Sequence, residues 1–350
     1  MHRISHLDGM RGLAILFVVL FHAFYRWSEI EPWQINPILR SLSSYGWIGV
    51  ELFFIISGYV IFLTLDKNLS MLSFVKKRWL RLFPAMLAIS VFIYVTAPFI
   101  PERPLGVPNY YDFFPGVLFL DPVFFKGFFG DDVRSLDGAF WSIYIEVKFY
   151  LISGFLYYYV KDKVGWGVLC LFGAFVFFGY FNNLFSDWIQ HKINLFFGLV
   201  GVEYYGWFLV GIFLYRFQMT DSVKYLIVSL VSGFFAVYLI FEKNGILPSI
   251  ISLVVIGLFY SIFYSSVFRR FFSIKPLVYL GFISYPLYLL HQNFVTGLSV
   301  KLHSLYSVDV GEIYPVVSLL LTILLSYGIA RYEPVFRDRL KNILLVVRWK

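Results

Sequence analysis

Two residues of the N-terminal apolar stretch carry side chains that could do chemistry inside a membrane. Arg11 and His22 are 11 residues apart, which is almost three turns of an α-helix, so both side chains lie on one face about 16 Å apart along the axis. A neutral histidine can take a proton from a hydroxyl near pH 7, and an arginine can bind phosphate oxygens in a bidentate manner. The pair predicts a proton acceptor and an anion contact on one helix.

Further ionisable residues interrupt apolar stretches, where a charged side chain is costly and points to function. The positions of Glu51, Glu146 and His291 within their stretches place them, together with His22, in the outer half of the membrane. A carboxylate can orient a histidine and stabilise its charged form, as in hydrolase triads. A structural ion pair is the alternative reading of any single one of them. Their spacing is not that of metal ligands, so we expect no metal.

A second group of charged residues gathers at the expected cytoplasmic boundary. Arg11, Lys77, Arg78 and Arg81 could together bind a phosphate-rich ligand. The alternative is that they are ordinary basic residues near lipid headgroups. We interpret the two groups as a polar channel with a phosphate-binding inner mouth and an acid–base centre outside. This arrangement suits acyl transfer to a sugar hydroxyl, and the absence of a G-x-S-x-G motif favours direct transfer.

The elements that must position these residues are membrane-spanning helices. Of the 350 residues, 59% are hydrophobic and 14% are charged, against about 25% charged in soluble domains. The net charge of +8 comes from short clusters between apolar stretches rather than from a basic domain, so nucleic acid is not an expected partner. The single cysteine, Cys170, rules out a disulfide within the chain.

We predict an all-α, polytopic bundle of about ten spans with both termini cytoplasmic, because Lys and Arg cluster in alternate connections. The connection 101–138 contains five prolines and is long enough to suggest a function of its own. We expect one transmembrane domain over residues 1–335 and a short basic cytoplasmic tail over 336–350. The predicted spans are 8–26, 47–65, 80–100, 139–160, 164–182, 195–215, 224–241, 246–268, 277–298 and 313–332.

Five segments combine these residues with aromatic and glycine neighbours in a definite order. They are Leu7–Ala14 continuing to His22, Gly46–Gly58, Arg78–Pro84, Trp141–Tyr150 and Ser284–His291. The set resembles the acyltransferase type three family of bacterial membrane proteins, whose first helix carries an arginine, ten residues and then a histidine. The chain departs from the family at Glu51, where aspartate is more frequent.

The resemblance implies a bacterial inner-membrane O-acyltransferase. It implies a cytoplasmic acyl-coenzyme A donor, usually acetyl-CoA, and an extracytoplasmic glycan acceptor, free or lipid-linked, such as O-antigen lipopolysaccharide or exopolysaccharide. The matched positions carry over three sets of roles. They are catalysis by His22, Glu51 and Glu146; donor binding by Arg11, Arg78 and Arg81; and substrate binding by Trp141, Ser142, Tyr285 and His291.

The residues by themselves leave other functions open. Histidines and carboxylates inside a membrane also serve as proton relays, so a proton-coupled transporter of a small molecule or lipid-linked sugar is the alternative. No inverted repeat of the kind many transporters contain is visible in the sequence. An acyl group other than acetyl, such as succinyl, is equally compatible with the motifs. The acceptor, the position acylated, the oligomeric state and a covalent acyl-enzyme are not determined by the sequence.

Overall fold

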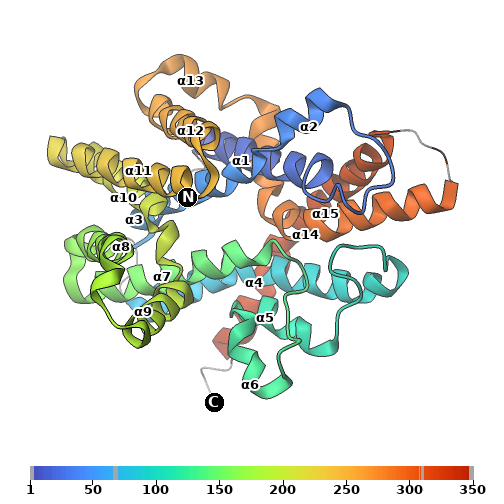
Figure 1. Ribbon diagram of the computed structural model, residues 1–350, viewed down its shortest axis with the longest axis horizontal. Helices are drawn as coiled ribbons and strands as arrows, with labels where there is room; N and C mark the ends of the chain where they lie inside the picture. Colours follow the sequence, from blue (N-terminus) through green and yellow to red (C-terminus); the bar gives the residue numbers. More distant parts are fainter. Residues whose placement is uncertain (1–3, 66–69, 307, 309–310, 347–350) are drawn as a thin grey trace. The chain divides into compact units, whose positions relative to one another are not determined.

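The computed structural model describes residues 4–65, 70–306, 308 and 311–346. Helices make up most of the described part of the chain, and no strand occurs in it. These helices fall into two compact units. Figure 1 shows the helices coloured by their position along the chain. The first unit draws on Met1–Val50, Lys77–Tyr144 and Ser266–Lys350, and the second on Glu51–Lys76 and Ile145–Ser265.

The first unit is built on three long helices. They are α1 (Ser5–Phe24), α14 (Lys275–Tyr306) and α15 (Ile313–Val346). Most of α4 (Met71–Thr96) and the start of α7 (Phe140–Val160) also belong to it. Its shorter elements are α2 (Pro37–Ser43), η1 (Gly46–Ile48), η2 (Ala97–Phe99), η3 (Tyr110–Asp112), α5 (Phe113–Leu118), η4 (Pro122–Phe125), α6 (Lys126–Phe129) and α13 (Ser266–Phe271).

Helices α1 and α14 pack against each other with their backbones in close approach. A Cβ atom on Gly281 of α14 would lie 1.8 Å from the carbonyl oxygen of Asp8 on α1. A Cβ atom on Gly12 of α1 would in turn lie 2.0 Å from the carbonyl oxygen of Leu277. Small residues allow such contacts between membrane helices, where van der Waals packing replaces the hydrophobic effect. The two glycines therefore determine how closely α1 approaches α14.

The second unit consists mainly of apolar helices. Its elements are α3 (Gly49–Leu65), η5 (Lys161–Lys163), α8 (Val164–Phe181), η6 (Asn182–Leu184), α9 (Asp187–Val200), η7 (Val202–Tyr204), α10 (Tyr205–Thr220), α11 (Val223–Asn244) and α12 (Ile246–Tyr264), with most of α7. Aromatic rings stack inside it, as between Phe149 and Phe208, whose centroids are 3.8 Å apart. Gly211 lets α10 approach α3, since a Cβ there would lie 2.0 Å from the carbonyl oxygen of Ile55.

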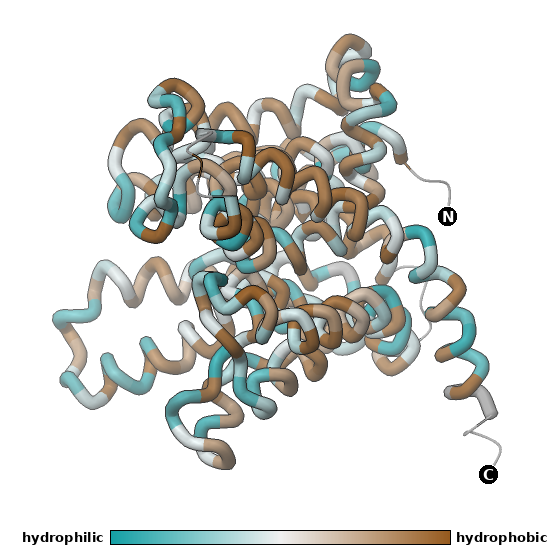
Figure 2. The backbone as a smooth tube through the Cα atoms, turned by 90° about the vertical axis from the view of Figure 1, so that its right-hand side faces the viewer, coloured by the Kyte–Doolittle hydropathy of each residue, from teal (hydrophilic) through white to brown (hydrophobic). Residues whose placement is uncertain are grey.

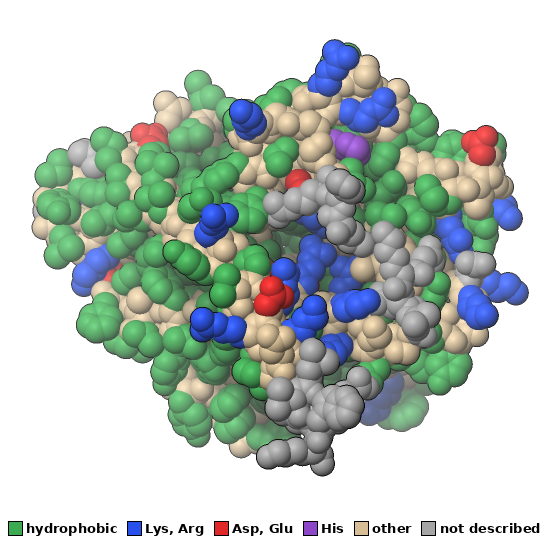
Figure 3. Space-filling model, turned by 180° about the vertical axis from the view of Figure 1, so that it is seen from behind, with side chains coloured by type: hydrophobic (Ala, Val, Ile, Leu, Met, Phe, Trp, Pro, Cys, Tyr) green, Lys and Arg blue, Asp and Glu red, His purple; other side chains and the backbone are tan. Residues whose placement is uncertain are grey.

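The helices agree with the prediction of a protein that crosses a membrane several times. By length and composition, seven described helical segments could each cross a membrane, and an eighth results if one bent pair counts as a single span. Apolar residues run along the long helices and hydrophilic residues lie at turns (Figure 2). Many large apolar side chains are exposed, and Figure 3 shows hydrophobic side chains spread over one face. Such a surface suits contact with lipid chains rather than water.

The count of about ten spans stays a prediction, as do the cytoplasmic termini. Helices α7 and α14 coincide with the predicted spans 139–160 and 277–298, but neither is among the seven. Both carry polar residues that lower their hydropathy, among them Glu146 and His291. Helix α15 continues into the predicted tail 336–350 and ends at Val346. Residues 347–350 lie outside the described part.

One predicted span differs from the structure. Residues 195–215 do not form a single straight helix, because α9 ends at Val200 and the chain bends by 61° before η7 and α10. Gly201 has a φ of +75° and caps α9 in the left-handed conformation, which glycine adopts without the steric cost of a Cβ. Glycine at this position therefore breaks an apolar stretch whose composition alone predicted a continuous span.

Candidate active site

The packing of α1 on α14 brings two histidines together. His22 lies in the last turn of α1, and His291 lies in the second half of α14. Their ring centroids are 4.8 Å apart, and the planes cross at 72°. His291 is fully buried, whereas His22 is only partly buried. Two of the predicted site residues are thus in direct contact, and the residue that retains some exposure is the one on α1.

A hydrogen-bond chain inside the first unit holds His291. Its Nδ1 lies 2.8 Å from the carbonyl oxygen of Tyr288, one turn earlier in α14. The Tyr288 hydroxyl lies 2.7 Å from Oγ of Ser142, in the first turn of α7. The predicted residues Ser142 and His291 are therefore connected through Tyr288, which the sequence analysis did not select. The signal was its position three residues before His291 in a helix.

Apolar packing fixes the helix ends on which the histidines lie. Ala23 and Phe24, which follow His22 on α1, belong to a buried cluster with Val295 of α14 and Tyr314 of α15. The ring of Phe21 also packs edge-on against His22, with centroids 5.0 Å apart. Since these neighbours are buried, α1 cannot rotate without opening the cluster. The direction of the His22 ring is therefore set by packing on both sides of it.

A second polar group anchors the long connection 101–138 to α14. The carboxylate of Asp137 is fully buried and accepts hydrogen bonds from the backbone N–H groups of Asn293, at 3.0 Å, and Ala139, at 2.9 Å. Burial raises the pKa of Asp137 to about 6, partly offset by these two bonds and by the nearby Arg103. The anchor therefore attaches the start of α7 to α14 two residues beyond His291.

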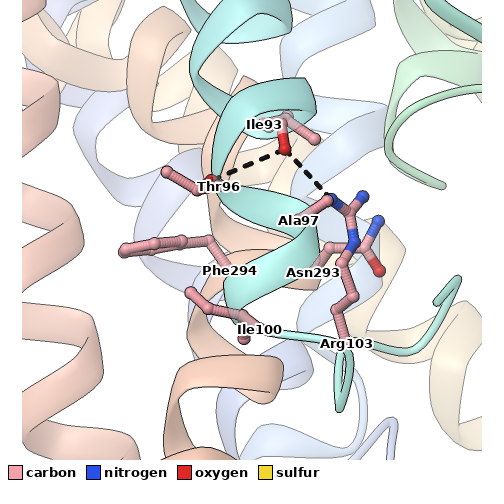
Figure 4. Close-up of a pocket in the computed structure, with 7 residues that line it drawn as sticks. All are labelled: Ile93, Thr96, Ala97, Ile100, Arg103, Asn293 and Phe294. Atoms are coloured by element: carbon pink, nitrogen blue, oxygen red, sulfur yellow. Dashed lines mark hydrogen bonds between the residues drawn. The ribbon is translucent and has the colours of Figure 1, made fainter. Parts of the chain in front are cut away.

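Arg103 and Asn293 complete this anchor. Arg103 donates to the carbonyl of Leu136, and the side-chain N–H of Asn293 donates to the same carbonyl at 3.1 Å. Asn293 also accepts from the backbone N–H of Leu105 at 3.3 Å. Figure 4 shows both side chains at a small pocket together with Ile93, Thr96, Ala97, Ile100 and Phe294. The length of the connection 101–138 suggested a function, but no local sequence pattern marks the residues of a buried loop anchor.

The three predicted donor-binding arginines have different surroundings. Arg11 pairs with Asp8 one turn earlier on α1, with Nη1 3.3 Å from Oδ1. Arg78 is buried, whereas Arg81 is exposed and lies within electrostatic range of Glu333 on α15. Asp8 and Glu333 were not selected from the sequence. Their carboxylates show that two of the arginines have acidic neighbours, with which a phosphate group would have to compete.

Trp141 and Tyr285 take different places around the same helices. Trp141 is 39% exposed at the start of α7, next to the buried Ser142. Tyr285 lies on α14 and donates its hydroxyl to the carbonyl of Leu82 on α4 at 3.1 Å. Tyr285 therefore links two helices, and its part in substrate binding stays a prediction, as does that of Trp141.

The two predicted catalytic carboxylates belong to the second unit. Ser57 of α3 and Tyr150 of α7 both donate to Oε1 of Glu146. Glu51, near the start of α3, is buried, and its Oε2 has no hydrogen-bond partner among the described residues. Two hydroxyl groups thus donate hydrogen bonds to Glu146, whereas one buried oxygen of Glu51 accepts none from the described residues. The catalytic roles of both stay predictions.

Metal binding has no candidate in the described residues. Nowhere in 4–65, 70–306, 308 and 311–346 do three or more His, Cys, Asp or Glu side chains group in a way that could hold an ion. On α14, His291 is followed by two amide side chains, Gln292 and Asn293.

Comparison with known proteins gives matches along nearly the whole chain. A family model described as an acyltransferase domain matches residues 4–331. The O-acetyltransferase OatA of Staphylococcus aureus is 26% identical over 91% of this chain and 55% of that protein. The peptidoglycan O-acetyltransferase OatA of Listeria monocytogenes is 27% identical over 45% of this chain and 25% of that protein. The chain thus spans about half the length of the Staphylococcus relative and a quarter of the Listeria relative. No solved structure gives a significant match.

Proposed function

This chain belongs to the acyltransferase family that matches residues 4–331, and on that premise we propose that it is a membrane O-acetyltransferase. It moves an acetyl group from cytoplasmic acetyl-coenzyme A to a hydroxyl of an extracytoplasmic glycan. Two relatives are named O-acetyltransferases, and one of these names specifies peptidoglycan, which supports a glycan acceptor. The membrane is the bacterial inner membrane, and residues 1–335 act as one enzyme domain.

The observation that carries the proposal is the contact between His22 and His291 beside the Ser142–Tyr288 hydrogen bond. His22 acts as the general base, because His22 is the partly buried residue of the pair, whereas His291 is fully buried. It takes the proton of the glycan hydroxyl as that oxygen attacks the carbonyl carbon of the acetyl thioester. The carbon–sulfur bond breaks, and the proton passes to the leaving thiolate. The products are an acetyl ester and free coenzyme A, and no serine nucleophile is needed.

The arginines provide the donor side of the proposal. Arg11, Arg78 and Arg81 bind the phosphate groups of coenzyme A, because guanidinium groups match phosphate oxygens in charge and geometry. Asp8 holds Arg11 at 3.3 Å and keeps the guanidinium oriented before the donor binds. Arg11 lies about three turns from His22 on the same helix, which separates the phosphate contact from the proton acceptor.

Three of the remaining selected residues act on the acceptor side. We assign Trp141, Ser142 and Tyr285 to the surroundings of the sugar, since an exposed indole offers a flat apolar face to a sugar ring. The catalytic roles predicted for Glu51 and Glu146 stay outside this proposal, because both carboxylates belong to the second unit.

The test compares surface glycans from bacterial cells that make the wild-type protein, a His22→Ala variant, or no copy of it. Wild-type cells should gain an alkali-labile acetyl group on one glycan, seen by mass spectrometry, and His22→Ala cells should lack it. His303→Ala is the matched control, because His303 also lies on a long helix but packs against Trp33. Equal acetylation in His22→Ala and wild-type cells would refute the assignment of His22.

A further inference from the structure

The contact between the two histidines contains two buried ring nitrogens that lack partners. Nδ1 of His22 and Nε2 of His291 make no hydrogen bond within the described part of the chain. Buried polar atoms of folded proteins nearly always have a partner, so each such exception needs an explanation. The two atoms belong to rings that already touch. The two nitrogens can therefore be each other's hydrogen-bond partner, provided that one carries a proton and the other a lone pair.

The hydrogen bond to Tyr288 decides which nitrogen of His291 carries the proton. Nδ1 lies 2.8 Å from the carbonyl oxygen of Tyr288, and a carbonyl oxygen can only accept. Nδ1 of His291 is therefore protonated. In a neutral imidazole the other nitrogen then bears the lone pair, so Nε2 of His291 is an acceptor. The only complementary arrangement makes Nδ1 of His22 the donor and leaves the lone pair of His22 on Nε2.

The distance between the rings fits such a bond. An N–H···N bond with a donor–acceptor distance of about 3 Å places two imidazole centroids roughly 5 Å apart. The observed centroids are 4.8 Å apart, with the planes crossing at 72°. This centroid separation is therefore compatible with an N–H···N bond between Nδ1 of His22 and Nε2 of His291.

We propose that His291 is the positioning residue for His22, in a chain that runs from the Tyr288 carbonyl through both imidazoles. His291 accepts the Nδ1–H of His22 and so keeps the Nε2 lone pair of His22 directed to the acceptor hydroxyl. The catalytic meaning of this chain rests on the proposed function. It replaces the expectation that His291 binds substrate, and it supplies a neutral ring where hydrolase triads use a carboxylate.

The chain also explains how His22 could carry charge during the reaction. When Nε2 of His22 takes the proton of the glycan hydroxyl, the ring becomes an imidazolium, and its Nδ1–H bond to His291 becomes charge-assisted and stronger. The hydroxyl oxygen forms its bond to the acetyl carbon, the thioester carbon–sulfur bond breaks, and the thiolate receives the proton from His22. His291 keeps its own proton on Nδ1 throughout, so no proton is lost or gained in the cycle.

The first test measures the tautomer of His22 and needs no activity. The full chain, labelled with nitrogen-15 at its six histidines, is placed in lipid bilayers and studied by solid-state NMR. Signals lost in a His22→Gln variant identify His22. We expect its proton on Nδ1 in the wild type and in His291→Gln, whose side-chain amide oxygen can accept. In His291→Asn the acceptor is missing, and the proton should move to Nε2. A wild-type His22 protonated on Nε2 would overturn the proposal.

The second test uses the same two variants to separate positioning from simple structure. Asparagine can replace the Nδ1–H bond to Tyr288 but offers nothing at the place of Nε2, whereas glutamine does the reverse. With acetyl-coenzyme A as donor and host membrane vesicles as the glycan source, His291→Asn should lower kcat about 100-fold with the KM for acetyl-coenzyme A unchanged. His291→Gln should keep about ten times more activity. The opposite order would mean that His291 only supports the Tyr288 carbonyl.

The two tests separate the positioning proposal from the proposed function. Wild-type vesicles that form no acetyl ester on any glycan, from a protein whose His22 carries its proton on Nδ1, would reject the enzyme assignment and keep the positioning. Ester formation with the Nε2–H tautomer would do the reverse. His303→Gln serves as the control in both tests, because this histidine also lies on α14 but contacts Trp33 and Tyr314.

Discussion

The first unit connects its polar side chains across distant segments, whereas the second uses polar contacts mainly to join neighbouring apolar helices. In the first unit, hydrogen bonds and ring contacts lead from Ser142 through Tyr288 and His291 to His22. In the second, Tyr59 donates to Gln218 at 2.6 Å, between helices whose interior is dominated by stacked aromatic rings. The contact between two imidazole rings, His22 and His291, lies in the first unit.

The difference shows where the molecule tolerates polar atoms without partners. A buried polar group is costly unless it is hydrogen-bonded, and in the second unit both hydroxyl donors around Glu146 are satisfied. The histidine contact of the first unit keeps two nitrogens available. In the second unit, Oε2 of Glu51 and the hydroxyls of Ser153, Ser232 and Ser252 also lack a described partner. We therefore expect chemistry at the histidine pair and mainly structural work in the second unit.

The largest expected effect comes from removing the base. His22→Ala should lower the rate of acetyl transfer by about 10²- to 10⁴-fold, the usual contribution of a general base. The melting temperature in detergent should change little, because His22 is only partly buried. Initial rates and thermal unfolding of the same preparations check both points. A large loss of stability would assign His22 to the scaffold instead.

Glycine substitutions can destabilise one helix contact in each unit separately and so test the comparison between the units. Gly281→Ala and Gly211→Ala each place a Cβ within about 2 Å of a carbonyl oxygen, of Asp8 and of Ile55 respectively. Each should cost about 3 kcal/mol or more, at the upper end of the usual cost of overpacking, and lower the melting temperature.

The activity of the two glycine variants distinguishes the units. Gly281→Ala moves α1 away from α14 and should reduce transfer more than Gly211→Ala does at an equal loss of melting temperature. Gly328→Ala on α15 is the control, because no atom lies within 4 Å of its added Cβ. Equal losses of activity in the first two variants would contradict a chemical role confined to the first unit.

Asp137 predicts a pH dependence of stability. Its pKa of about 6 in the folded protein exceeds the ordinary value of 3.8, so between these values the folded protein binds a proton that the unfolded chain does not. Stability should therefore fall as pH rises from about 4 to about 6, by on the order of 3 kcal/mol. Melting temperatures of the wild type and Asp137→Asn over this range check it. The variant should lack this part of the slope, and parallel curves would exclude Asp137 as its source.

Glu146→Gln should have the smallest effect on stability, and it tests whether the second unit has a mainly structural role. The amide is neutral, so the bonds from Ser57 and Tyr150 lose their charge-assisted character, at a cost of about 2 kcal/mol. Thermal unfolding measures the loss, with Ser57→Ala as the matched single-bond control. A fall in kcat as large as that of His22→Ala, without a loss of stability, would instead support the predicted catalytic role of Glu146.

Much of the architecture followed from local patterns in the sequence. The apolar stretches marked where long helices lie, because a segment of about 20 apolar residues is stable as a helix inside a membrane. The apolar stretch 195–215 did not predict the 61° bend between α9 and α10, because the left-handed conformation of Gly201 depends on the backbone around it and not on hydropathy. The spacing of Arg11 and His22 correctly placed both on one helix, because that relation is internal to the helix.

The family also followed from the sequence, since its motifs are read in order along the chain and the family model covers residues 4–331. The tertiary structure alone decided that His22 touches His291 and that Asp137 anchors the long connection. The first contact depends on how α1 and α14 are rotated and how closely they approach at Gly12 and Gly281. Composition and spacing determine which helices form, but packing between residues far apart in the chain determines which of their side chains meet.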